Sequence, residues 1–216
     1  MHYLGFGFTD GYGEPKSKVL SQKSKVEELK GYASGCSLVV KKEVLDKIGG
    51  YDEEYYMYHD DIELNWRAKL AGYKIVLAPK SVVYHKYEFA RSVRMLFYME
   101  RNRYLVLFSF YKFRTILLIL PALLFMELAM LLYSVAKGWF KTKLRVYGYF
   151  LKLRTWRHII QVRKQVRGFR IKKDKQLIRD YAGKILFQEI ENPLLKYIGN
   201  PILNLYLKLI KKIIVW

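Results

Sequence analysis

Carboxylates are concentrated in one short stretch of an otherwise basic chain. Residues 50–67 read GYDEEYYMYHDDIELNWR and hold six acids, four tyrosines and a histidine. The whole chain of 216 residues has a formal net charge of +20. Carboxylate and imidazole groups can carry charge or bind a metal ion, so this window is well equipped for chemistry. The adjacent Asp60 and Asp61 lie near its centre.

The sequence predicts that a helix begins at this acidic pair. Leu64, Ala68 and Ala71 follow the i, i+4, i+7 spacing of one helix face, and Gly72 supplies a stop. A helix N-terminus favours carboxylates because it carries a partial positive charge. Taken alone, the two acids are therefore explained as ordinary residues at the start of a helix.

Short elements surround this helix. CSLVV is a β-prone run, and KKEVLDKI predicts a short helix ended by Gly49 and Gly50. KIVLAP predicts a strand, and SVVYHK predicts a second extended piece with a histidine near its end.

The order of motifs in residues 49–85 resembles one half of a known catalytic domain. Gly-Gly-aromatic-Asp-Glu is followed by an aromatic pair, an acidic pair and an Arg. Ala-Gly-Tyr, a Pro and a Val-rich stretch ending in His complete the series. This series is similar to the C-terminal half of the catalytic domain in family 2 glycosyltransferases of the GT-A fold, and the resemblance covers about residues 31–90. It implies an α/β fold, a partial GT-A domain followed by membrane-associated α-helices.

The resemblance implies a role for the acidic pair. Inverting sugar transfer needs a base that takes the proton of the acceptor hydroxyl as it attacks the anomeric carbon. In the family this base is the Asp of the pair, which corresponds to Asp61. Asp60 stands where most members have Glu, and Glu63 where most have Asp, so each keeps its charge but changes its reach by one methylene.

The neighbouring residues also match family positions. Trp66 is expected to pack on the acceptor side or in the core, and Arg67 to pair with an acid. The small residues 34–37 match a strand that borders the acceptor pocket. In several members the equivalent of His85 helps to hold Mg²⁺ or Mn²⁺ on the nucleotide diphosphate, so the resemblance implies this metal. His59 is close enough in sequence to influence Asp60 or Asp61.

ERNR (100–103) follows the stretch of resemblance. Similar Arg-Asn-Arg segments occur in membrane-associated members of the family. Arginine binds phosphate through forked donors. Arg101 and Arg103 are therefore expected to contact either the diphosphate of a lipid-linked acceptor or lipid headgroups.

The nucleotide-binding half of such a domain is not recognisable here. Family members place alternating strands and helices with an Asp-x-Asp metal motif before this region. Only about 30 residues precede the matched stretch, and Asp10 stands alone there. The chain is thus expected to be a C-terminal portion whose full activity needs an N-terminal glycosyltransferase half as partner.

Charge divides the chain into two regions. Residues 1–100 hold 15 Lys and Arg against 14 Asp and Glu, whereas residues 101–216 hold 24 against 5. Basic charge mixed with long apolar runs indicates an anionic membrane surface as partner, and no nucleic-acid-binding module is present to indicate nucleic acid. The single cysteine, Cys36, excludes an intramolecular disulfide.

Residues 115–136 read TILLILPALLFMELAMLLYSVA and carry one charge, Glu127. This length is sufficient to cross a membrane, and the alternative is a buried core helix. Pro121 should kink the helix, and Glu127 must face protein, water or an interface. A re-entrant hairpin bent at Pro121, with residues 104–111 as its first leg, also fits.

The end of the chain predicts an amphipathic helix. Lys196, Asn200, Asn204 and Lys208 recur every four residues and should share one face. Such a helix fits the membrane interface and the surface of a soluble core equally well.

These observations predict three regions and one function. Residues 1–94 form the acceptor-side portion of a GT-A domain, residues 95–138 a membrane-associated helical segment, and residues 139–216 a basic amphipathic tail. The expected activity is inverting transfer of a sugar from a nucleotide-sugar to a lipid-linked or cell-surface glycan acceptor at the cytoplasmic face. The alternative is a non-catalytic membrane anchor or scaffold.

Overall fold

Helices make up most of the computed structural model, which describes residues 1–9, 11, 26–86, 95–186 and 192–216. Asp10 lies outside these described residues, as do residues 87–90 at the end of the stretch of resemblance.

The first half of the chain forms short elements. They are β1 (Glu27–Glu28), the 3₁₀ helix η1 (Gly35–Ser37), α2 (Lys42–Ile48), the 3₁₀ helix η2 (Glu53–Tyr55), α3 (Asp60–Leu70) and β2 (Val76–Leu77). β1 and β2 are antiparallel, with Glu27 opposite Leu77 and Glu28 opposite Val76.

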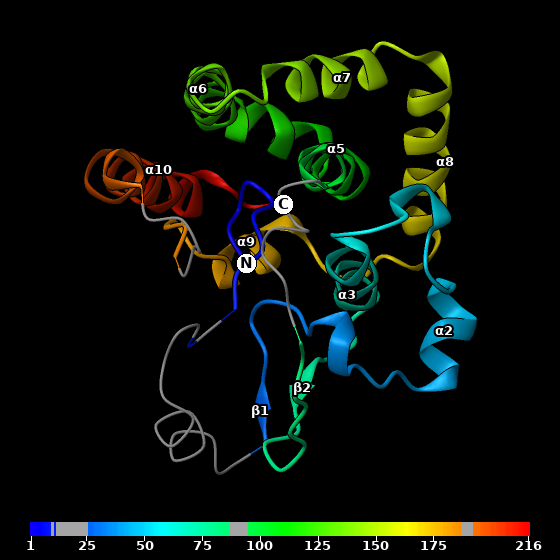
Figure 1. Cartoon of the computed structure of the whole chain (residues 1–216). Coiled ribbons are helices and arrows are strands. Elements are labelled where there is room, and N and C mark those ends of the chain that lie inside the picture. The colour runs from blue at the N-terminus through cyan, green and yellow to red at the C-terminus, as the bar shows by residue number, and fades with distance from the viewer. Residues whose placement is uncertain (10, 12–25, 87–94, 187–191) are drawn as a thin grey trace.

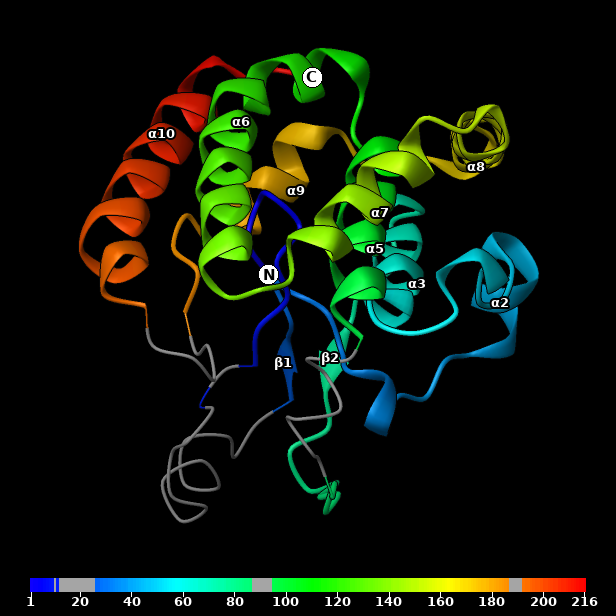
Figure 2. The same cartoon turned by 45° about the horizontal axis from the view of Figure 1, so that its top comes forward.

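The second half is helical. It contains α5 (Leu96–Phe110), α6 (Phe113–Ala136), α7 (Phe140–Phe150), α8 (Leu153–Phe169), α9 (Asp174–Asp180), the π-helical segment η3 (Leu195–Gly199) and α10 (Asn200–Ile213). α6 and α10 lie on one side of α5, and α3 and α8 lie on the other (Figures 1 and 2).

The predicted helices 41–48, 60–71 and 115–136 are confirmed as α2, α3 and α6. Gly49 and Gly72 follow α2 and α3 with φ angles of 82° and 90°. Only glycine adopts this conformation without steric cost, so these two residues end the helices where the sequence predicts.

The expected α/β arrangement is not shown. Within the described residues the strands are β1 and β2, each two residues long. Residues 36–40 contribute part of η1 and extended chain, and residues 81–86 form no strand. A strand needs a hydrogen-bonded neighbour along its length, and the described chain gives β2 one short partner.

One hydrophobic cluster extends over all three predicted regions. It includes Leu4, Trp66, Leu107, Val162 and Leu207, all of which are buried. The packing in the structure is continuous across these regions. The division into 1–94, 95–138 and 139–216 therefore stays a prediction from composition.

A buried network of charges joins α5, α6 and α7. Lys143 of α7 is fully buried, and its Nζ lies 2.8 Å from Glu100 Oε2 and 2.6 Å from Glu127 Oε1. Tyr147 donates a hydrogen bond to Glu127. Of the three surroundings expected for Glu127, namely protein, water or an interface, the structure shows protein. Buried charges persist only when they are paired in this way.

α6 is the one helix in the described part of the chain that is long and apolar enough to cross a membrane. It runs without a break through Pro121, so a hairpin bent at that residue is not seen. Exposed apolar residues follow one face along the whole helix: Leu117, Leu120, Leu124, Leu128, Leu132 and Val135.

α10 packs against α6 in the opposite direction (Figure 2). Tyr206 donates a hydrogen bond of 2.8 Å to the carbonyl of Leu118, and the Trp216 indole donates one of 2.8 Å to Thr115 Oγ1. The predicted polar face is only partly realised, because Asn200 is buried and exchanges two hydrogen bonds with the backbone of Ile185.

Candidate active site

Asp61 lies in the first turn of α3, and its carboxylate is partly exposed. The backbone N–H of Ile62 donates to Oδ1 over 2.7 Å, and that of Gly35 donates to Oδ2 over 3.2 Å. Burial, together with a smaller effect of the Asp60 charge, raises the pKa of Asp61 to about 6 despite these hydrogen bonds. The carboxylate is thus held in one orientation and is poised to take up a proton near neutral pH.

Asn65 fixes the segment that faces Asp61. Its side chain accepts a hydrogen bond from the N–H of Ala33 and donates to the carbonyl of the same residue, over 3.1 and 3.0 Å. It also donates to the carbonyl of Asp61 over 2.7 Å. Residues 33–35 and the start of α3 are therefore one assembly. An Asn in a helix interior, one turn after the acidic pair, is the sequence signal that could have indicated this role.

Asp60 and Tyr51 complete the surroundings of the carboxylate. Asp60 is partly exposed at the first position of α3. Burial raises the pKa of Tyr51, and the nearby charges of Asp60 and Asp61 add to the effect. An aromatic ring and two carboxylates therefore share this partly open region, which suits recognition of a polar substrate with an apolar face.

The loop before α3 has an unusual backbone. Tyr56, Tyr58 and His59 all have positive φ angles, of 56°, 62° and 62°. Each such residue costs about 1 kcal/mol or more, so the loop persists only because other groups hold it.

Asn102 of α5 supplies that restraint and was not predicted. Its Nδ2 lies 2.6–2.8 Å from the carbonyl oxygens of Tyr55, Met57 and Tyr58. Arg101 donates from Nη2 to the carbonyls of Glu54 and Tyr55, over 2.5 and 3.1 Å. The ERNR segment therefore shapes the loop that leads into the acidic pair.

Both predicted phosphate-binding arginines lie inside the protein. The side chain of Arg103 is 1% exposed; it contacts Glu100 at 3.3 Å and stacks on Phe6 at 4.4 Å. Arg101 is also buried, with Tyr98 and Tyr149 rings beside its guanidinium group. In this structure their partners are carboxylates, carbonyls and rings, and contact with phosphate or headgroups stays a prediction.

Glu63 and Arg67 form a buried pair. Arg67 donates to both carboxylate oxygens of Glu63, over 2.5 and 2.6 Å. The same guanidinium group donates to the carbonyls of Ile48 and Gly50, over 2.5 and 2.6 Å. The expected pairing of Arg67 with an acid is confirmed. The pair fixes the turn after α2 and does not face an open site.

Trp66 lies in the core. It is almost fully buried, and its ring lies 5.0–5.6 Å from the rings of Phe110, Tyr111 and Tyr181. Of the two predicted surroundings, acceptor side or core, the structure shows the core.

His59 turns away from the acidic pair. Its Nε2 donates to the carbonyl of Gly5 over 3.0 Å, and burial lowers the pKa of the ring to about 4. The ring is neutral at pH 7 and connects the loop to the N-terminal segment. The expectation that it tunes Asp60 or Asp61 has no contact to support it.

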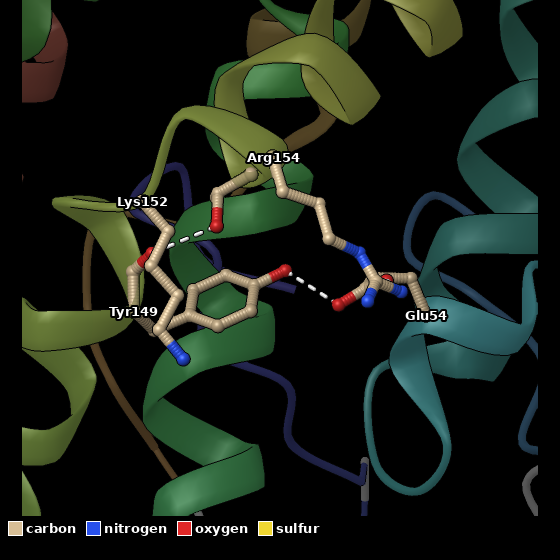
Figure 3. Close-up of a pocket in the computed structure, with 5 residues that line it drawn as sticks. Glu54, Tyr149, Lys152 and Arg154 are labelled. Atoms are coloured by element: carbon tan, nitrogen blue, oxygen red, sulfur yellow. Dashed lines mark hydrogen bonds and ion pairs between the residues drawn. The ribbon is translucent and has the colours of Figure 1, made fainter.

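A shallow pocket of about 210 Å³ lies behind the loop, lined by Glu54, Tyr149, Lys152, Arg154 and Thr155. Tyr149 donates to Glu54 Oε1 over 2.8 Å, and Arg154 reaches Oε2 at 3.7 Å (Figure 3). These contacts secure η2 against the turn between α7 and α8.

Asp52 and His158 make a second connection to α8. His158 Nε2 lies 2.9 Å from Asp52 Oδ2. Burial opposes ionisation of Asp52, but the hydrogen bonds from His158 and the Glu54 N–H outweigh it and lower its pKa. The same contact raises the pKa of His158. The loop is therefore held from both α5 and α8.

The predicted metal ligand, His85, belongs to no cluster of three or more metal-binding side chains among the described residues. His85 is exposed in the segment 81–86. The described residues contain no group of three or more His, Cys, Asp or Glu side chains able to hold a metal ion. These residues alone do not fit a Mg²⁺ or Mn²⁺ site, so no chemical step is assigned to a metal.

Comparisons with known proteins find a short similarity. A stretch of 55 residues is 38% identical to N-acetylglucosaminyl-diphospho-decaprenol L-rhamnosyltransferase of Mycobacterium tuberculosis, in strains CDC 1551 / Oshkosh and ATCC 25618 / H37Rv. It covers 26% of this chain and 18% of each relative. No family model matches the chain, and no solved structure matches it. The chain therefore shares one short stretch with a glycosyltransferase and spans less than a fifth of that enzyme's length.

Proposed function

We propose that the chain is the acceptor-side portion of an inverting, family 2-like glycosyltransferase. Its donor would be a nucleotide-sugar, and its acceptor a lipid-linked or cell-surface glycan. The short similarity to a rhamnosyltransferase supports the reaction class. The site geometry supports the assignment of the base.

The observation that carries the proposal is the state of Asp61. A carboxylate that is oriented by two backbone N–H groups and has a pKa of about 6 is ionised at pH 7, yet it binds a proton readily. A general base is most effective when its pKa lies near the working pH. An ordinary exposed Asp would be a weaker proton acceptor.

In the proposed reaction Asp61 takes the proton of the acceptor hydroxyl. The hydroxyl oxygen forms a bond to the anomeric carbon while the bond to the nucleotide diphosphate breaks. Asp60 and Tyr51 would orient the acceptor, whereas Glu63, Arg67 and Trp66 act through the scaffold. A role of His85 in holding Mg²⁺ or Mn²⁺ stays a prediction, and no step of the proposed reaction is assigned to the metal.

Two further parts of the proposal concern partners. The nucleotide-binding region would come from an N-terminal glycosyltransferase half. The basic and apolar second half would place the site at a membrane, on its cytoplasmic face, because cationic flanks favour that side.

The proposal is tested with Asp61→Asn in the complex with its nucleotide-binding half. Loss of a general base should lower sugar transfer by about 10²–10⁴-fold while helix content stays unchanged. Asp46→Asn is a matched control, because Asp46 is exposed on α2 and lies 3.8 Å from the ammonium group of Lys42, far along the chain from the acidic pair. Unchanged transfer by Asp61→Asn would remove the catalytic assignment.

A specific observation also favours the alternative, a membrane anchor or scaffold. α6 carries a continuous exposed apolar face beside a region of strong positive charge. An anchor would bind membranes equally well with Asn at position 61, and its partners would retain their activity. The same variant therefore separates the two functions.

A further inference from the structure

A basic hollow lies where three distant segments meet at the start of α6. Its lining consists of Lys112, Phe113, Arg114, Arg163 and Trp216, which enclose about 360 Å³. The C-terminus lies beside the first turn of α6 (Figure 2). The hollow is remote from the acidic pair in sequence and is not used by the proposed transfer reaction.

The polar part of this lining is cationic. It contains three basic side chains, and no Asp or Glu side chain is among the described residues that line it. Asp174 is close to the turn, but its carboxylate already accepts hydrogen bonds from the N–H of Lys112, from Thr115 Oγ1 and from Arg170. The hollow therefore has a surplus of positive charge that favours an anion.

Arg163 is fixed in the wall of the hollow. Its Nη1 donates to the carbonyls of Phe108 and Tyr111, over 2.5 and 2.7 Å. Burial lowers the pKa of Arg163, and the charge of Arg170 adds to this effect. An anion beside this guanidinium group would offset both the loss of water around its charge and the repulsion from Arg170.

The hollow opens onto the apolar face of α6. Phe113 is 67% exposed, and Leu117, Leu120 and Leu124 follow it on the same side of the helix. The ring of Trp216 is held in place by its hydrogen bond to Thr115. A ligand with an anionic head and an apolar chain would meet complementary surface at both ends.

We propose that this hollow binds a phosphate group carried by an amphiphile. The phosphate would lie between Lys112, Arg114 and Arg163, and the apolar chain would follow the exposed face of α6. Arginine and lysine bind phosphate through charge-assisted hydrogen bonds, which supports this ligand class. The inference does not depend on the role of Asp61, so Asp61→Asn should bind the same ligand normally.

The test is isothermal titration of the full chain in dodecyl maltoside with dodecyl phosphate, dodecanol and inorganic phosphate. Dodecyl phosphate should bind at least about tenfold more tightly than either of the other two, because only it supplies both head and chain. The double variant Lys112→Gln/Arg114→Gln should weaken its binding by about tenfold or more.

The matched control is Lys164→Gln/Arg167→Gln, which removes the same charge from exposed positions of α8 outside the hollow. It should change binding by less than about twofold, since diffuse surface charge is screened by salt. Equal weakening by both double variants would overturn the site.

The remaining outcomes are equally decisive. If dodecanol binds as tightly as dodecyl phosphate, the hollow does not recognise the phosphate group. If inorganic phosphate binds as tightly, the hollow does not recognise the apolar chain, and the ligand is not an amphiphile. Should the double variant fail to fold, Arg114→Gln alone keeps the test available, because that side chain is exposed. Circular dichroism of every variant verifies the fold.

Discussion

At the scale of single residues, Asp61 combines a chemical advantage with a cost in stability. Burial raises its pKa to about 6, whereas an unfolded chain has a value of about 3.9. Between these values the folded protein binds more protons than the unfolded one. The contribution of Asp61 to stability is therefore fully present at low pH and falls as the pH rises through this window.

Asp61→Asn should remove this pH dependence. The difference between a pKa of about 6 and one of about 3.9 corresponds to about 3 kcal/mol, and partial exposure reduces the expected effect to about 1 kcal/mol. Between pH 4 and pH 7 the native chain should lose about 1 kcal/mol of its free energy of unfolding through Asp61, and the variant should not. The difference in free energy of unfolding, variant minus native, should therefore rise by that amount. Denaturant titrations at pH 4, 5.5 and 7 measure it. A difference that stays constant over this range would contradict the raised pKa.

Some site residues could be predicted from the sequence because their signal is local. Asp61 at the start of a helix follows from spacing within α3, and the pairing of Arg67 with an acid was implied by the resemblance and lies within the same helix. Asn102 could not be predicted, because its three carbonyl partners lie 44–47 residues earlier in the chain. The same reason applies to Arg103, whose buried partners come from the N-terminal segment and from α6.

At the scale of elements, the loop between η2 and α3 is held by α5. Three residues with positive φ would relax in an isolated peptide. The side chains of Arg101 and Asn102 prevent this by binding the carbonyls of residues 54, 55, 57 and 58. Helix α5 thus positions the acidic pair from outside the stretch of resemblance.

Asn102→Ala should therefore affect both stability and site geometry. It removes a donor from the partly buried carbonyls of Met57 and Tyr58, whereas the Tyr55 carbonyl keeps its hydrogen bond from Arg101. This should lower the free energy of unfolding by about 2–4 kcal/mol. Denaturant unfolding measures the loss, and amide hydrogen exchange of residues 55–59 should increase first. Gln165→Ala, at an exposed position of α8, should change neither quantity. Unchanged exchange in the loop would show that other contacts define its shape.

The helices could be predicted, whereas of the predicted strands only KIVLAP contains one among the described residues, the two-residue β2, for a physical reason. A helix satisfies its hydrogen bonds within one segment, so spacing and the stops at Gly49 and Gly72 are sufficient. A strand depends on neighbours distant in the chain. The β-prone runs CSLVV and SVVYHK carry the right residues, but the described part of the chain does not pair them into strands.

At the scale of the whole molecule, positive charge and exposed apolar surface belong to the same half. Residues 101–216 carry a large excess of Lys and Arg. The outward faces of α6 and α10 expose leucine and isoleucine side chains, among them Leu124, Leu128 and Leu205. Glu127 is drawn inward by Lys143, so the outward face of α6 between residues 115 and 136 is free of charge. This combination suits an anionic lipid surface.

Leu124→Asp/Leu128→Asp should therefore prevent membrane association without unfolding the protein. The two side chains are 60% and 58% exposed, so few internal contacts are lost. Removing two leucines from a lipid surface should cost at least about 3 kcal/mol, or about 100-fold in partitioning, and the added negative charge increases the loss. Flotation with vesicles of phosphatidylcholine and phosphatidylglycerol measures it. The control, Val82→Asp/Val83→Asp, makes the same change at exposed apolar positions outside the helices and should float normally. If both double variants float like the native chain, the apolar face of α6 is not the membrane contact, and the basic residues alone must account for binding.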